Sequence, residues 1–210
     1  MILQNTVDPR GHLQRSETRI VSFMGNRGIL HDDDRNIVKP WAHKSWVCCS
    51  TSYKSIDRRP LFRTPPNRYS ELFFLDEVTA YAAGHRPCNY CRREAFQNFK
   101  QFWCMANKPG VTSDSISAKE IDAQIHSERA TKGREKMTFF APISELPVGA
   151  MFEIEDAFYA VGVGSFLRWS FNGYHQCKLN INGDVTVLTP RSVVEAFRIG
   201  LRPMFHKSAY

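Results

Sequence analysis

The chain has 210 residues, of which 42% are hydrophobic and 23% are charged, as in an average globular protein. This composition excludes extensive disorder, and no apolar run approaches the roughly 20 residues that a membrane-spanning helix needs. The N-terminal residues lack the basic and then apolar pattern of a signal peptide. We therefore expect a cytoplasmic protein that does not associate with membranes.

The excess positive charge is confined to the first half of the chain. Residues 1–108 contain 17 Lys and Arg against 10 Asp and Glu, whereas residues 109–210 contain 11 of each. A basic module favours a polyanionic partner, most commonly nucleic acid. A merely solubilising surface is the alternative interpretation, because net charge alone fixes no partner.

Residues 1–18 are polar and show no periodicity, which predicts a flexible arm. The following segment alternates short apolar runs with turn residues, which predicts strands near 19–23, 28–31, 37–41 and 45–53. A further apolar strand is expected at Leu72–Leu75. Asp76 is a suitable N-cap for a short helix over Glu77–Ala83 that ends at Gly84.

Two further helices follow in the sequence. Phe96, Phe99 and Trp103 recur at helical spacing, which predicts an amphipathic helix over Asn89–Ala106. Residues 109–138 read as a helical connector, whose helix begins with a capping box of Ser117 and Glu120.

Residues 139–210 predict a small β-rich domain with one terminal helix. Its apolar runs are short, alternating and separated by turn residues. The helix is expected to begin with Thr189 as N-cap and Pro190 as its first residue, and to end at Gly200.

The strongest chemical signal is Cys88-Asn89-Tyr90-Cys91. Two thiolates at this spacing can hold one tetrahedral Zn²⁺ ion. Redox enzymes also use Cys-x-x-Cys, but they place it after a strand in a thioredoxin-like unit. Here it follows a helix and a Gly-x-Arg-Pro turn, so zinc is the stronger interpretation.

A structural zinc site needs two more ligands. Cys48 and Cys49 are adjacent, and neighbouring strand residues point to opposite faces, so one of the two is expected to bind the metal. We take Cys49 as the first candidate. His31 and His43 are the candidates for the fourth ligand, with His31 preferred. Two cysteines remain, and we expect them to be buried small apolar residues: Cys104 and Cys177.

The stretch Tyr69–Arg93, with its aromatic strand, short helix, Gly84 and Arg-Pro-Cys-x-x-Cys, resembles the second half of the metal-binding domain of Ada-type DNA-repair proteins. The chain is also similar to an uncharacterised bacterial family with NRG-x-LHD, ELFFLDE, GHRPC and VLTP stretches. The Ada resemblance implies a cysteine-rich zinc module over residues 19–108 that binds DNA through basic residues. In Ada, one zinc thiolate accepts a methyl group, which would implicate Cys49. The adjacent cysteines here depart from Ada's first Cys-x-x-x-Cys pair, which argues against methyl transfer.

Several arginines lie near the predicted site in the sequence, and four interleaved aromatic residues could stack on bases: Trp46, Tyr53, Tyr69 and Tyr90. Core positions are the alternative interpretation, favoured for Trp46 and Tyr69. The expected nucleic-acid contacts are Arg58, Arg59, Arg63, Arg68, Arg92 and Arg93.

A second possible chemistry lies in the connector helix. Asp122 and His126 fall at i and i+4 on one helix face, where they could bind Mg²⁺ or Mn²⁺ or act as a general base in phosphodiester cleavage. The solvated face of an ordinary amphipathic helix gives the same pattern.

We therefore predict an α+β protein with an Ada-like zinc module and a small β-rich C-terminal domain. The leading functional hypothesis is a zinc-containing nucleic-acid-binding protein, most simply a DNA-binding protein of repair or defence. The alternatives are a metal-dependent nuclease and a structural zinc protein that binds another protein.

Overall fold

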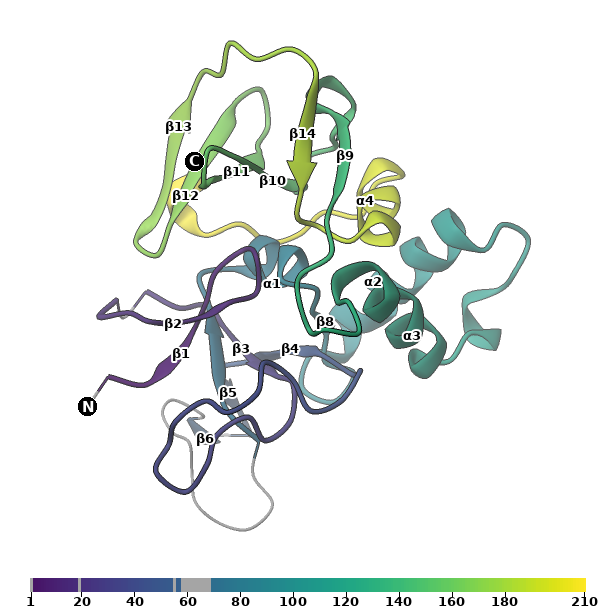
Figure 1. Cartoon of the computed structure of the whole chain (residues 1–210). Coiled ribbons are helices and arrows are strands. Elements are labelled where there is room, and N and C mark those ends of the chain that lie inside the picture. Colours follow the sequence, from purple (N-terminus) through teal and green to yellow (C-terminus); the bar gives the residue numbers. More distant parts are fainter. Residues whose placement is uncertain (1, 19, 55, 58–68) are drawn as a thin grey trace.

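The computed structural model describes residues 2–18, 20–54, 56–57 and 69–210, and shows a mixed α+β protein with two large sheets and four helices. Figure 1 shows the C-terminal sheet above the N-terminal sheet, with the short helix α1 between them. Within the described residues, no helix has both the length and the apolar character needed to cross a bilayer.

The N-terminal sheet has six strands in the order β2-β1-β7-β3-β4-β8. Most neighbours pair antiparallel, but β1 pairs parallel with β7 and β4 pairs parallel with β8. The strands in chain order are β1 (Gln4–Val7), β2 (Leu13–Arg15), β3 (Phe23–Asn26), β4 (Val47–Ser50), β7 (Leu72–Phe74) and β8 (Arg86–Pro87). A separate two-stranded ladder joins β5 (Ser52–Tyr53) to β6 (Ile56–Asp57).

The C-terminal sheet is entirely antiparallel, in the order β13-β12-β11-β10-β14-β9. Its strands in chain order are β9 (Phe139–Pro142), β10 (Met151–Ile154), β11 (Ala157–Val161), β12 (Phe166–Ser170), β13 (Gly173–Cys177) and β14 (Asp184–Val187). The predicted β-rich C-terminal half is therefore confirmed at the level of its strands.

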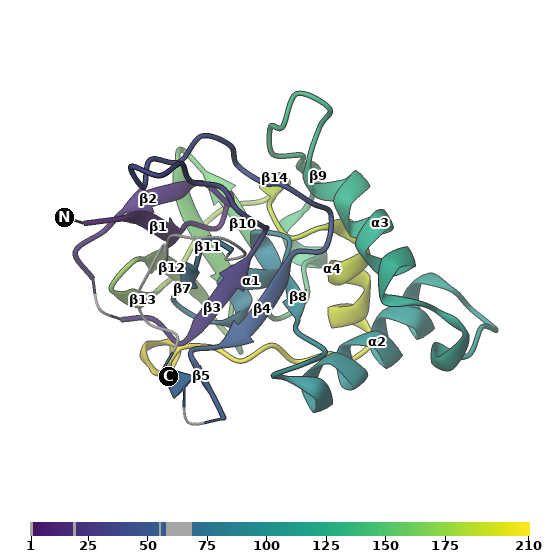
Figure 2. The ribbon, with the colours of Figure 1, turned by 90° about the horizontal axis from the view of Figure 1, so that it is seen from below.

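The helices are α1 (Glu77–Ala82), α2 (Arg93–Asn107), α3 (Ala118–Arg129) and α4 (Arg191–Arg198). In the part of the chain that the structure describes, three single 3₁₀ turns accompany them: η1 (Ser113–Ser115), η2 (Ile143–Glu145) and η3 (Lys207–Ala209). Seen from below, α2, α3 and α4 gather on one side of the sheets (Figure 2). Their apolar faces meet in one cluster that includes Phe99, Trp103, Ile121 and Phe197.

Helix α1 joins the two sheets because both of its faces are apolar. Val78 and Ala82 pack with residues of the C-terminal sheet, including Trp169, whereas Ala80 and Ala83 pack with the N-terminal sheet. The predicted cap is present, since the Asp76 carboxylate accepts a hydrogen bond from the Thr79 amide at 2.8 Å.

The expectation of a flexible N-terminal arm over residues 1–18 is wrong. β1 and β2 form a hairpin at the edge of the sheet, and Val7 is completely buried. Arg10 in the turn donates from Nε to the Glu153 carboxylate of β10 at 2.7 Å, which ties the hairpin to the C-terminal sheet. Strands were also expected at residues 28–31 and 37–41, but these form only an isolated bridge between His31 and Ile37.

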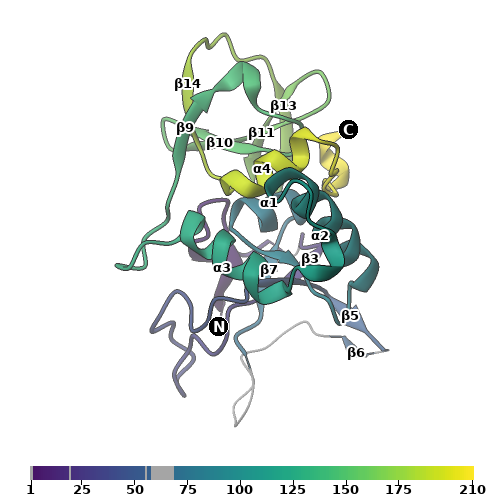
Figure 3. The ribbon, with the colours of Figure 1, turned by 90° about the vertical axis from the view of Figure 1, so that its right-hand side faces the viewer.

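The start of α4 differs from the prediction. Pro190, not Thr189, is the N-cap residue, and the Thr189 hydroxyl instead accepts the Met151 amide of β10 at 2.9 Å. The first turn of α4 is capped by the Glu128 carboxylate of α3, which accepts from the Ser192 amide at 2.9 Å and from its hydroxyl at 2.6 Å. Figure 3 shows α4 between the C-terminal sheet and the other helices.

Replacing Glu128 with alanine is expected to lower the free energy of unfolding by about 1 kcal/mol, the usual cost of removing a helix cap. For a chain of this size the loss corresponds to a melting temperature about 2–4 °C lower in thermal unfolding. Glu135→Ala, at an exposed position outside the helices, is the matched control. Equal melting temperatures for the two variants would show that this carboxylate does not stabilise α4.

Candidate metal centre

Three cysteines from separate segments come together at one end of the N-terminal sheet. Cys49 lies on β4, Cys88 directly follows β8, and Cys91 lies in the turn before α2. Their three sulfur atoms all lie within 4.8 Å of one another. Such a group could hold a metal ion, because a tetrahedral cation bound by thiolates needs its sulfur donors at this kind of separation.

Strand pairing explains how these cysteines meet. β4 and β8 run parallel, with Cys48 opposite Pro87, and the Cys88 amide donates to the Cys48 carbonyl at 2.9 Å. This pairing brings the start of the Cys-x-x-Cys turn beside β4. The turn is closed by the Arg92 amide, which donates to the Cys88 carbonyl at 3.0 Å, so α2 begins at Arg93 and not at Asn89 as predicted.

The structure distinguishes between the two adjacent cysteines. Cys49 packs beside Cys88 and Cys91, whereas Cys48 points to the opposite face and packs with Leu72 and Phe74. Burial raises the pKa of the Cys48 thiol above its ordinary value, despite a contact of 3.4 Å with Arg92. Cys48 is therefore a core residue, and Cys49 is the one placed to bind a metal.

The surroundings favour negative charge on the Cys88 sulfur and disfavour it on the Cys49 sulfur. Hydrogen bonds from the Cys49 and Cys91 thiols lower the pKa of Cys88 to about 2, and the Tyr90 amide also donates to its sulfur at 3.4 Å. The same contact with Cys88 raises the pKa of Cys49. A divalent cation would displace the remaining thiol protons, because metals bind cysteine as thiolate.

His31 is not part of this sulfur group. Its Nδ1 atom lies 2.5 Å from the Ser70 hydroxyl oxygen, and partial burial lowers the pKa of its imidazole. His43, the other candidate, lies on an exposed loop and is also outside the group. Among the Cys, His, Asp and Glu side chains that the structure describes, none joins the three cysteines as a fourth ligand. The structure thus gives no support to His31 as a ligand.

An exposed aromatic surface adjoins the cysteines. Tyr90, between Cys88 and Cys91, is 63% exposed, and its ring meets that of Tyr53 edge-on at 5.1 Å between centroids. Lys54 Nζ lies 5.6 Å from the Tyr90 centroid and 5.7 Å from that of Tyr53. We call these three residues the tyrosine patch. Tyr90, one of the predicted stacking residues, is therefore accessible to a partner.

The structure describes two of the six arginines that were expected to contact nucleic acid, and these two differ in exposure. Arg58, Arg59, Arg63 and Arg68 lie outside the described residues. Arg93 is exposed at the start of α2.

Arg92 does not face solvent as a nucleic-acid contact would. It donates to the buried Glu77 carboxylate at 2.6 Å, and its guanidinium lies 4.3 Å from the centroid of the Phe23 ring. The expectation for Arg92 is therefore corrected, because this side chain ties α1 to the turn before α2.

Asp122 and His126 lie on the buried face of α3, not on a solvated one. Both carboxylate oxygens of Asp122 accept from Arg86, at 2.8 and 2.7 Å, and one also accepts from the Ser45 hydroxyl at 2.7 Å. His126 packs edge-on against Trp41 at 4.7 Å. Burial, reinforced by the charges of Arg129 and Lys44, lowers the pKa of His126 to about 4. This pair is not grouped with other ligand side chains among the described residues, so the geometry supports structural roles for both.

Sequence reasoning missed a cluster of cations around Trp46 and the end of α1. Arg27 and Arg129 are each 1% exposed, and their guanidinium carbons lie 4.3 and 3.9 Å from the centroid of the Trp46 ring. Arg129 donates to the Gly84 carbonyl and Lys136 to the Ala82 carbonyl, so cations distant in sequence complement the C-terminal end of α1. Nothing in the local sequence distinguishes these residues from surface cations.

Comparisons of the chain with family models, with curated proteins and with solved structures gave no match. The likeness to the Ada-type module therefore depends on sequence motifs, which are specific over Tyr69–Arg93 and looser over Arg19–Tyr53.

Proposed function

We propose that this protein binds one Zn²⁺ ion through Cys49, Cys88 and Cys91, and that the surface beside this site binds nucleic acid. The observation that carries the proposal is the convergence of three sulfur atoms from β4 and the Cys-x-x-Cys turn within 4.8 Å. Soft thiolate donors in a tetrahedral arrangement favour zinc over hard cations such as Mg²⁺ or Ca²⁺.

The three sulfur donors fit zinc and leave one of its four coordination positions without a protein ligand from this group. Three thiolates supply three of the four ligands that tetrahedral zinc requires, and the fourth position would take water or a ligand from outside the group. This differs from the four-ligand structural site expected from the sequence. Zinc bound here would cross-link β4 to the start of α2, and so would hold together the basic half of the chain.

Charge and surface chemistry support nucleic acid as the partner. The excess of positive charge falls within residues 1–108, which carry all three cysteines. The tyrosine patch offers rings for base stacking with a cation beside both of them, and Arg93, three residues after Tyr90, is exposed. The resemblance of Tyr69–Arg93 to a DNA-binding module points to DNA. A nuclease is not proposed, because Asp122 and His126 are engaged in the buried contacts described above.

The Tyr90→Ala variant is expected to bind a fluorescently labelled single-stranded oligonucleotide more weakly than the wild type, as measured by anisotropy. Loss of one base–aromatic stack costs about 1–3 kcal/mol, or roughly 5- to 150-fold in affinity. Tyr90→Phe keeps the ring and should bind like the wild type. Tyr210→Ala removes a tyrosine that is 87% exposed at the C-terminus, and is the second control.

The salt dependence tests the electrostatic part of the same proposal. The logarithm of the association constant should fall linearly with the logarithm of salt concentration, by about 0.7 per phosphate contact on a single strand. Binding that is insensitive to salt, or that is unchanged in Tyr90→Ala, would contradict the proposed surface. Specific capture of a protein in the absence of nucleic acid would favour the protein-binding alternative.

A further inference from the structure

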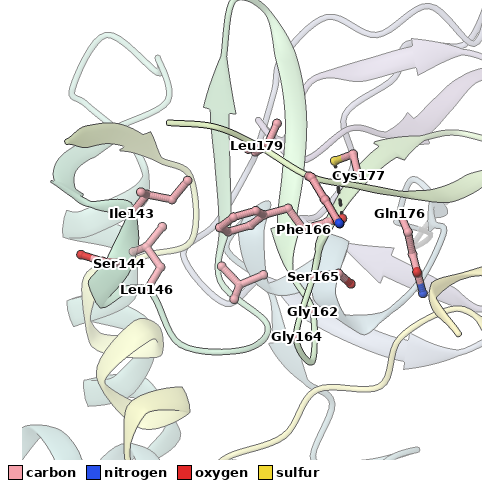
Figure 4. Close-up of a pocket in the computed structure, with 12 residues that line it drawn as sticks. Ile143, Ser144, Leu146, Gly162, Gly164, Ser165, Phe166, Gln176, Cys177 and Leu179 are labelled. Carbon is pink, nitrogen blue, oxygen red and sulfur yellow. Dashed lines mark hydrogen bonds between the residues drawn. The ribbon is translucent and has the colours of Figure 1, made fainter. Parts of the chain in front are cut away.

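The C-terminal sheet contains a pocket of about 920 Å³ that the proposed metal and nucleic-acid function does not use. The pocket lies between the η2 segment, the β11–β12 turn and the end of β13. Ile143 and Leu146 approach it from one side, and Phe166 and Leu179 from the other (Figure 4). Its volume falls in the range of about 300–1,000 Å³ typical of small-molecule sites.

The pocket exists because the two faces of this sheet are covered unequally. One face, with Met151, Leu167 and Trp169, packs on α1. The other carries an aromatic row in which Phe152 stacks on Tyr159 and meets Phe166 edge-on, with centroid distances of 5.6 and 5.7 Å. Helix α4 reaches part of this second face through Val194, and the remainder forms the pocket.

The mouth of the pocket is built from residues with little bulk. The β11–β12 turn runs through Gly162 and Gly164, and a side chain placed on Gly164 would meet no other atom within 4 Å. Val163, between these glycines, is 87% exposed. An apolar residue at the tip of the turn gives an entering apolar molecule a surface to contact outside the pocket.

The polar side chains that line the pocket indicate which polar groups a ligand would carry. Ser144, Ser165 and Gln176 supply neutral hydrogen-bonding groups, and Lys178 is the one charged residue among those that line it. No carboxylate belongs to this lining set. The pocket therefore combines an apolar floor with a single positive charge at its exposed rim.

We propose that this pocket binds a small amphipathic anion, meaning a molecule with an apolar body and one negatively charged group. The apolar body lies against Val161, Phe166 and Leu179, where it is removed from water. The charged group remains near the rim beside Lys178. The ligand class follows from this charge complementarity, and the site is independent of the three cysteines.

Cys177 provides a reporter within the pocket. It is half-buried, lines the cavity, and donates from its thiol to the Phe166 carbonyl at 3.5 Å (Figure 4). A bound ligand should shield this sulfur from alkylating reagents. Peptide mass spectrometry reads the modification at Cys177 separately from that of the other five cysteines.

The test uses the full-length, metal-loaded protein and two dyes with the same ring system, the anionic anilinonaphthalene sulfonate and the neutral phenylnaphthylamine. We expect the sulfonate to bind with one site per chain in a fluorescence titration and to slow iodoacetamide modification of Cys177. Lys178→Gln should weaken sulfonate binding by about twofold to fivefold, the scale of an exposed charge pair, and leave the neutral dye unaffected. Lys207→Gln, at an exposed lysine outside the pocket, should change neither.

Two results would overturn the proposal. One is a saturating concentration of the sulfonate that leaves the rate of Cys177 alkylation unchanged, since the dye would then bind elsewhere. The other is equal weakening of both dyes in Lys178→Gln, which would show that the lysine does not select a charged ligand. Neither result would bear on metal or nucleic-acid binding.

Discussion

Replacing Cys88 with serine is expected to abolish stoichiometric metal binding and to destabilise the N-terminal sheet. The Cys88 sulfur contacts both other cysteines, and its position is fixed by the pairing of β4 with β8. Structural zinc contributes an apparent 10–16 kcal/mol to folding in small zinc modules, which is comparable to the whole stability of about 5–15 kcal/mol of a typical domain. Losing even part of this contribution would unfold the metal-bearing half at physiological temperature.

Metal analysis of the purified protein measures this directly, as zinc bound per chain. Two cysteine variants serve as controls. Cys177→Ser lies in the other sheet, and Cys48→Ala alters the neighbour of Cys49 that packs into the core. Both should retain one metal ion per chain. A Cys88→Ser protein that contains as much metal as the wild type would refute the site. Metal loss in Cys48→Ala without unfolding would show that Cys48, and not Cys49, binds the metal.

Cobalt substitution gives a second readout on the same variants. Co²⁺ in a tetrahedral thiolate site absorbs visible light, and each bound thiolate adds charge-transfer intensity in the near ultraviolet. We expect a spectrum for three sulfur ligands in the wild type, which changes when an added thiol or imidazole fills the fourth position. A spectrum of four sulfurs that is insensitive to added ligands would show that the site is closed.

The local elements were predictable because their signals are contained within a few residues. The Asp76 cap of α1 and the capping box of α3 were both predicted, and the structure has both. The Cys-x-x-Cys spacing likewise predicted that Cys88 and Cys91 lie together, and the structure places them in one sulfur group. In these cases the interacting groups are at most four residues apart, so the sequence order already places them together.

Contacts between distant segments could not be predicted. The cap of α4 comes from Glu128, 64 residues before Ser192, so the local Thr189-Pro190 signal suggested the wrong N-cap. The helical period correctly placed Asp122 and His126 on one face of α3. Periodicity does not say, however, whether a polar helix face is exposed to solvent or buried against a basic side chain from another part of the chain. Only the tertiary contact with Arg86 decides this.

The same limit explains the outcome for the arginines and for the N-terminal arm. Arg92 and Arg93 are adjacent and identical in type, yet one is buried against Glu77 and the other is exposed, because the start of α2 sends their side chains in different directions. Gln4–Val7 is too polar to read as a strand, and it pairs with β7 from more than sixty residues away. Its ordering depends on that partner and not on its own propensity.

Neutralising Asp122 by the Asp122→Asn substitution is expected to cost about 3–5 kcal/mol of folding free energy, because it leaves the buried Arg86 guanidinium without its counter-charge. Asp122 is 2% exposed and Arg86 is 5% exposed, so water cannot replace the lost partner. For a chain of this size the loss corresponds to a fall in melting temperature of about 6–20 °C, measured by calorimetry. Asp114→Asn, at an exposed carboxylate in η1, is the matched control and should melt like the wild type.

The double variant Arg86→Met/Asp122→Leu separates the role of the ion pair from the cost of an unpaired charge. Removing both charges leaves no buried ion, so the double variant should be more stable than Asp122→Asn, since apolar replacements of buried pairs are often neutral. A catalytic Asp122 would behave differently: Asp122→Asn would then abolish phosphodiester cleavage while leaving the melting temperature near that of the wild type.

Because the Arg86–Asp122 pair joins α3 to the strand that leads into Cys88, its loss should also weaken metal retention. Full metal occupancy in a strongly destabilised Asp122→Asn protein would show instead that the sulfur site holds its geometry without support from α3.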